Sequence, residues 1–70
     1  MYKVINLPNW IKCATINIDN NMYYLNVRTI HTIGAVDLSE PFNSLISAKL
    51  FYSRNYQIKA KWIQMELLNV

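Results

Sequence analysis

Residues Ile11–Ile30 constrain the fold more than any other stretch, because they have the pattern of a β-hairpin. Two runs rich in β-branched and aromatic residues flank Asp19-Asn20-Asn21. Asparagine and aspartate tolerate the positive φ angles that tight hairpin turns require, although Asn-Gly is the stronger turn signal. The sequence therefore predicts two antiparallel strands, with Asn20 and Asn21 at the centre of a two-residue turn.

The alternation of side chains predicts the register of this hairpin. Pairing Asp19 with Met22 places nearly all apolar side chains of both strands on one face and most polar ones on the other. A three-residue loop would mix the two sets, and such a slip would expose half of the core. The predicted apolar face pairs Ile18 with Tyr23, Ile16 with Leu25, Ala14 with Val27 and Lys12 with Thr29; the polar face pairs Asn17 with Tyr24, Thr15 with Asn26 and Cys13 with Arg28.

The segment that begins at Asp37 carries the clearest helix-start signal in the chain. Asp37 and Glu40 have the spacing of a capping box, and Pro41 suits the first turn of a helix. We expect a helix of about three turns over residues 42–53. A strand over the same segment stays open, because several apolar residues also alternate with period two. The predicted apolar arc of the helix excludes Phe51 and consists of Phe42, Leu45, Ile46, Leu50 and Tyr52.

Two further strands complete the predicted fold. Tyr2–Leu7 alternates as a strand until Pro8, which cannot donate a hydrogen bond to a sheet. Tyr56–Leu67 fits a strand better than a helix, and a change of parity after Trp62 suggests a bulge or an edge buried by a second chain. The predicted class is α+β: a small antiparallel sheet of about four strands, in the chain order β-β-β-α-β, with one helix packed on its apolar face.

The length and the cysteine count limit how such a chain can be stabilised. Seventy residues suffice for one domain, residues 1–70, but lie near the lower limit for a single core. One cysteine excludes an intramolecular disulfide, and the sequence has no His/Cys cluster that suits a metal ion. Stability must then come from apolar packing or from association with another chain, so a homodimer stays open. A hydrophobic content of 53% fits either route.

The sequence contains no pattern typical of an active site. Cys13, His31 and Asp37 are the only set that resembles a nucleophile, a base and an orienting group, and no family signature surrounds Cys13. Paired carboxylates are improbable with four acidic residues, and the sequence lacks a phosphate-binding glycine loop and an HExxH motif. We therefore expect a non-enzymatic protein without a cofactor.

Cellular location and origin are predicted from composition alone. No segment has the pattern of a signal peptide or the apolar length needed to span a bilayer, and a lone free thiol suits a reducing compartment. These features predict a cytoplasmic protein that does not bind membranes. Ile, Asn, Lys, Tyr and Phe supply 30 of the 70 residues. Their A/T-rich codons favour a low-GC genome, a phage or another mobile element.

Protein binding is the main functional hypothesis, because a small chain rich in apolar residues leaves some of them exposed, and exposed apolar patches mark interfaces. Inhibition of a host defence complex by a phage protein, of the anti-CRISPR kind, is one concrete form of it. An equal alternative assigns the same residues to the monomer's own core. The candidate contact residues belong to types enriched at interfaces or to the apolar C-terminal segment: Trp10, Phe51, Tyr52, Trp62, Ile63, Met65, Leu67 and Leu68.

Nucleic-acid binding is the alternative hypothesis. The net charge of +3 is mild compared with that of most autonomous DNA-binding domains. Tyr24 and Arg28 lie on the predicted polar face of the hairpin, and a basic strip with an aromatic ring forms if Lys59 and Lys61 join the same side. An ordinary solvated sheet face explains the same residues without any ligand, and we favour that interpretation over nucleic-acid contact.

Overall fold

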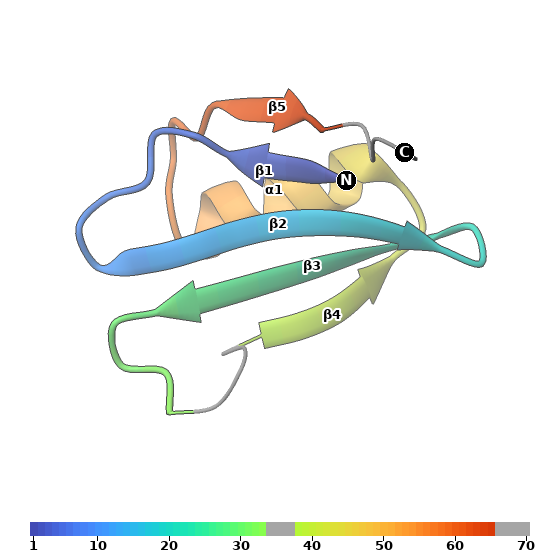
Figure 1. Ribbon diagram of the computed structural model, residues 1–70. Helices are drawn as coiled ribbons and strands as arrows, with labels where there is room; N and C mark the ends of the chain where they lie inside the picture. The colour runs from blue at the N-terminus through green and yellow to red at the C-terminus, as the bar shows by residue number, and fades with distance from the viewer. Residues whose placement is uncertain (34–37, 66–70) are drawn as a thin grey trace, which may run out of the picture.

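The computed structural model describes residues 1–33 and 38–65 and arranges them as one antiparallel sheet with one helix (Figure 1). The elements are β1 (Tyr2–Val4), β2 (Ile11–Asp19), β3 (Met22–Thr29), β4 (Leu38–Phe42), α1 (Leu45–Asn55) and β5 (Trp62–Gln64). The strand order is β4-β3-β2-β1-β5, so α1 carries the chain from one edge of the sheet to the other. The helix packs across one face only, which confirms the α+β class but adds a fifth strand to the predicted sheet.

The central hairpin has the predicted register from Asp19↔Met22 to Cys13↔Arg28. Asn20 and Asn21 adopt φ angles of 50° and 63°, the left-handed backbone that the turn requires. One predicted pair is wrong: Thr29 pairs with Ile11 and not with Lys12, because a bulge interrupts the ladder between Ile11 and Cys13. The bulge places the apolar Ile11 in the core and leaves Lys12 exposed.

The core lies between the sheet and α1. The sheet contributes buried side chains from its three central strands, and the helix contributes Ala48 and Tyr52. Ala48 has a small side chain, so the helix can approach the strands closely, and the Tyr52 ring fills the space beside it. The buried apolar residues are Val4, Ile11, Ala14, Ile16, Leu25, Val27, Ala48 and Tyr52.

The predicted helix start is wrong, because Leu38–Phe42 forms strand β4 on the free edge of β3. Pairing with β3 satisfies the backbone groups of this segment, and Pro41 is tolerated because β4 is an edge strand. The helix begins after Ser44, whose Oγ accepts a hydrogen bond from the backbone N–H of Ser47 at 3.1 Å. That contact is a standard N-cap.

The buried side of α1 also differs from the predicted apolar arc. Phe51, which the prediction excluded, packs against the core together with Leu45. Ile46 and Leu50, which the prediction included, are 70% and 48% exposed. The prediction counted Phe42 as a helical residue. The helical residues that pack in or against the core lie on a face centred on Ala48, with Leu45, Phe51 and Tyr52 beside it.

The strand predicted over Tyr56–Leu67 is much shorter, with only Trp62–Gln64 in β5. Tyr56 is the C-cap of α1, and its N–H donates to the Tyr52 carbonyl at 2.8 Å. The segment that follows is held by the side chain of Asn6, which binds Lys59 O at 2.9 Å and the N–H of Lys61 at 2.7 Å. Those side-chain contacts take the place of a strand ladder. Leu67 lies outside the described residues.

Candidate functional site

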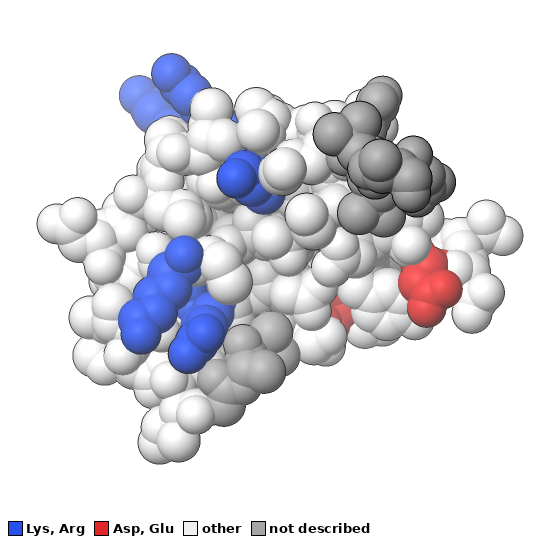
Figure 2. All heavy atoms as spheres, viewed as in Figure 1, with Lys and Arg blue, Asp and Glu red and all other residues white. Residues whose placement is uncertain are grey.

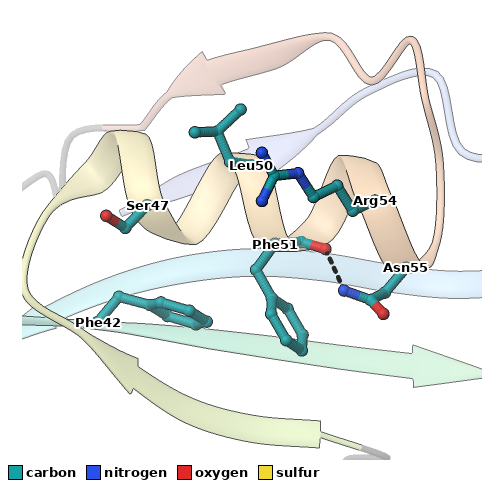
Figure 3. A pocket seen from close by; sticks show the side chains of 6 residues that line it. All are labelled: Phe42, Ser47, Leu50, Phe51, Arg54 and Asn55. Atoms are coloured by element: carbon teal, nitrogen blue, oxygen red, sulfur yellow. Dashed lines mark hydrogen bonds between the residues drawn. The ribbon is translucent and has the colours of Figure 1, made fainter.

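A pocket of about 360 Å³ opens between α1 and β4 (Figure 3). Its lining comes from one side of the helix, from Ser47 in the first turn to Asn55 at the end, and from the end of the adjacent strand. The volume lies at the small end of the range of ligand pockets, so the pocket suits a single large side chain or a small ligand group. The lining residues are Phe42, Ser47, Leu50, Phe51, Arg54 and Asn55.

Apolar side chains form the walls of this pocket. The rings of Phe42 and Phe51 meet with centroids 5.3 Å apart and planes inclined by 50°. Leu50 lies on the other side of the opening, and Ile46 precedes it by one helical turn on the outer surface of α1. Ile46 and Leu50 therefore extend the apolar lining onto the exposed side of the helix.

The rim of the pocket carries polar groups with unused hydrogen-bonding capacity. Arg54 lies in the last turn of α1 and, among the described residues, makes no ion pair with a carboxylate. Asn55 donates through Nδ2 to the Phe51 carbonyl at 2.8 Å, which leaves its side-chain oxygen as an acceptor. Figure 3 shows the Arg54 side chain extending above Phe51 toward Leu50, so its guanidinium stands over the apolar wall.

The sequence-predicted protein contacts do not form one surface. Phe51 lines the pocket, whereas Ile63 and Met65 are exposed at the β5 edge of the sheet. Trp10 is partly exposed and stacks on Tyr56 with ring centroids 6.1 Å apart, at the C-terminal end of α1. Leu67 and Leu68 lie outside the described residues.

Tyr52 and Trp62 are part of the packing between helix and sheet. Tyr52 is fully buried. Its ring is T-shaped against the Trp62 ring and stacks on the Tyr56 ring, with centroid distances of 5.2 Å and 5.5 Å. The Tyr52 hydroxyl donates to Gln57 Oε1 at 2.8 Å. Burial, together with nearby Cys13 and Tyr56, raises the pKa of Tyr52 to about 12. This hydroxyl therefore stays protonated at neutral pH as a hydrogen-bond donor of the core.

The second surface is the side of the sheet opposite α1, which we call the open face. It carries the residues that alternate with the buried ones, among them Lys3, Asn26 and Arg28. Figure 2 views this face and shows basic side chains gathered beside β1 and over the end where β2 begins and β3 ends. The basic residues of those segments are Lys3, Lys12 and Arg28. Acidic side chains lie toward the opposite, hairpin end.

The predicted nucleic-acid contacts are distributed over this open face and its edge. Tyr24 shares the face with Arg28 but is four residues away along β3, about 13 Å at strand spacing. Lys59 and Lys61 are exposed near the β1–β5 edge, where the N–H of Ile5 binds the carbonyl of Lys61 at 2.9 Å. The sequence reading missed Lys3 and Lys12. Lys3 was detectable from the alternation of its strand, but Lys12 depends on a bulge that leaves no clear signal.

The described residues do not form the catalytic set considered from sequence. Cys13 lies opposite Arg28, whereas His31 follows β3 and uses its backbone N–H to bind Thr29 Oγ1 at 3.2 Å. No hydrogen bond joins Cys13 to His31 within residues 1–33 and 38–65, and Asp37 lies outside these ranges. The same residues contain no group of three or more potential metal ligands. They also contain no helix long and apolar enough to cross a membrane.

Comparison with protein-family models, with curated proteins and with solved structures found no match to this chain.

Proposed function

We propose that the protein is a non-enzymatic protein-binding module whose contact site is the pocket between α1 and β4, together with the helix surface beside it. The observation that carries this proposal is the exposure of Ile46 and Leu50, one turn apart, next to a pocket walled by Phe42 and Phe51. Full burial of a fully exposed side chain of this size gains about 1.5–3 kcal/mol, so burying Ile46 and Leu50, which are 70% and 48% exposed, gains roughly two-thirds and one-half of that. A continuous apolar surface of this kind is typical of a protein interface.

The partner's chemistry follows from Arg54. A guanidinium at the edge of an apolar pocket favours a carboxylate, with which it forms a bidentate pair. The fitting segment presents a large apolar side chain to the pocket and an aspartate or glutamate close to it. An apolar anchor with a charged pair beside it is the usual arrangement of an interface hot spot.

The concrete form of the proposal is an inhibitor encoded by a phage or mobile element, acting in the cytoplasm on a host defence complex in the anti-CRISPR manner. Its support is the small size, the A/T-rich codon preference and the absence of a catalytic motif in the sequence. With a net charge of +3, the protein lacks the acidic surface that would imitate DNA. Inhibition then depends on apolar and hydrogen-bonded contacts.

Affinity capture from nuclease-treated bacterial lysate tests the site. The wild type is compared with Ile46→Glu, Arg54→Glu and the control Ile58→Glu, whose side chain is 84% exposed and lies outside the pocket lining. We expect the wild type and the control to retain the same protein, and the two site variants to lose at least nine-tenths of it. Equal capture by all four proteins contradicts the proposed site.

The oligomeric state of the purified proteins in solution tests whether the partner is a second copy of this chain. If the wild type is a dimer and Ile46→Glu is a monomer, the pocket surface is a homodimer interface. If both are monomers, a partner lost from the Ile46→Glu capture is a different protein.

A further inference from the structure

We infer that the open face is a second binding surface and that its occupant is a single-stranded nucleic acid, held mainly through its phosphates. This surface lies on the side of the sheet that α1 does not cover, so it is independent of the pocket between α1 and β4.

Three cationic side chains share one part of this face. Lys3 pairs with Thr15, and Arg28 pairs with Cys13, two residues from Thr15 along β2. With strands about 4.8 Å apart, the Cα atoms of Lys3 and Arg28 are then roughly 12 Å apart. Lys12 is exposed on β2, the strand that lies between β1 and β3 in the sheet, and is next to Cys13 at the bulge. Long side chains bridge such separations easily, so the three cations form one anion-binding patch.

The described carboxylates lie away from this patch. Glu40 pairs with Leu25, a buried core residue, so its side chain is on the α1 side of the sheet. Asp19 is at the hairpin turn, six residues along β2 from Cys13, which is about 20 Å. Asp37 and Glu66 lie outside the described residues. Among the described residues, this half of the face therefore carries cations only, and such a field attracts a polyanion and orients it.

Arg28 is not engaged in an internal ion pair within the described part of the chain. Its Nε is buried and has no hydrogen-bond partner among the described residues. The outer nitrogens of the guanidinium are not in that buried, unpartnered set, and a phosphate bound to them would give the positive charge of Arg28 the anionic partner that the described residues do not supply.

The middle and far part of the face favour a single strand over a duplex. Between the patch and the hairpin turn the open face carries Thr15, Asn17 and Asn26, whose side chains can bind base edges, and then Tyr24. Tyr24 is half-buried, and its Cα lies about 13 Å from that of Arg28 along β3, a distance that a short single strand covers. A duplex would keep its bases stacked away from these groups, whereas a single strand presents them.

Fluorescence anisotropy with a labelled oligothymidylate of about twelve nucleotides tests the inference. Contacts to three phosphates predict a slope of about −2 for log K against log salt, and hence about 15-fold weaker binding at 200 mM than at 50 mM salt. Lys12→Glu and Lys49→Glu make a matched pair, because each lowers the net charge from +3 to +1, by the change of one Lys from +1 to −1. Lys12 is on the open face, whereas Lys49 is on α1 near the Tyr2 ring, at 5.5 Å from its centroid.

We expect Lys12→Glu to weaken binding at least fivefold at 50 mM salt and to lower the magnitude of the salt slope by about 0.7, while Lys49→Glu stays within twofold of the wild type. The two variants should have matching unfolding temperatures, which shows that each one folds. Absence of binding at 50 mM salt, or equal weakening by both variants, overturns the inference. The inference is also overturned if a duplex or a poly-glutamate of equal charge binds as tightly as the oligothymidylate. The first result would make the open face a duplex-binding surface, and the second a surface for acidic proteins.

Discussion

Asn6 connects the end of β1 to the approach of β5, and its removal tests how this edge of the sheet is built. The side chain donates from Nδ2 to Lys59 O at 2.9 Å and accepts from the N–H of Lys61 at 2.7 Å. Its own carbonyl accepts from Gln57 Nε2 at 2.7 Å, and Gln57 in turn accepts from the Tyr52 hydroxyl. One polar network therefore links β1, the end of α1 and β5.

Asn6→Ala removes two of these hydrogen bonds and leaves the backbone ones in place. Each is worth about 1 kcal/mol net, and because the site is exposed, water replaces part of the loss. We expect the free energy of unfolding to fall by about 1–2 kcal/mol. A domain of this length has about 4–10 kcal/mol in total, and a loss of this size lowers Tm by about 5–15 °C.

Two further variants separate the hydrogen bonds from general effects of the substitution. Asn6→Asp keeps the acceptor for Lys61 and loses the donor to Lys59, so its stability should lie between those of wild type and Asn6→Ala. Asn17→Ala is the control, because Asn17 is exposed on β2 and has no side-chain hydrogen bond among the described residues. Urea unfolding followed by circular dichroism gives the three free energies. If Asn6→Ala is no less stable than Asn17→Ala, the network does not hold this edge.

Three more outcomes follow from the same structure. Ser44→Ala should lower the free energy of unfolding by about 1 kcal/mol, because it removes the N-cap, whereas Glu40→Ala should lower it less. A larger loss for Glu40→Ala in urea unfolding would mean that the helix is capped by the predicted capping box and not by Ser44. Ile16→Ala should cost about 3 kcal/mol, because Ile16 is fully buried, and a loss below 1 kcal/mol would place it outside the core. The folded-state pKa of Tyr52 is raised to about 12 from 10.0, so stability should be complete below pH 10 and fall as pH rises toward 12, where the unfolded chain has already released its proton. Tyr52→Phe should abolish that decline, which urea unfolding at pH 9 and 11.5 would measure.

The hairpin was predictable because all its determinants are local. Asn20 and Asn21 accept positive φ angles, and the alternation of Ile16 and Leu25 with polar neighbours allows one register only. The exception at Lys12 is instructive, since a bulge moves one residue without changing the composition of either strand. Patterns with period two predict faces reliably and predict irregularities poorly.

The elements after the hairpin depend on contacts that the local sequence does not contain. Leu38–Phe42 carries a helix-start signal, yet it pairs with β3 because that strand offers a free edge and β4 can cover it. The segment from Tyr56 to Lys61 alternates like a strand, yet Asn6, more than fifty residues earlier in the chain, supplies its hydrogen bonds. In both places a long-range partner outweighs a local preference.

The candidate site was predictable by residue type and not by position. Phe51 was among the expected contact residues and lines the pocket. Leu50 was expected only in the apolar arc of the helix, and Arg54 was not among the candidate site residues. Arg28 was expected on the polar face, and the structure adds Lys3 and Lys12 to it. A helical wheel or a strand alternation pattern identifies which residues share a face. The strand order β4-β3-β2-β1-β5 decides which of those residues lie next to one another in space.

The two edges of this sheet are poorly suited to binding a partner by adding a strand, which favours contacts through side chains. β4 contains Pro41, which lacks the N–H that a further strand would need, and β5 spans only Trp62–Gln64. Short edge strands and edge prolines are the means by which natural sheets prevent pairing with other chains. A peptide that bound by strand addition would have at most three residues to pair with on β5. Variants at Ile46, Arg54 and Lys12, which leave both edges intact, should therefore control binding. Substitutions in the edge strands should change it little, except at Phe42, which is part of the pocket wall.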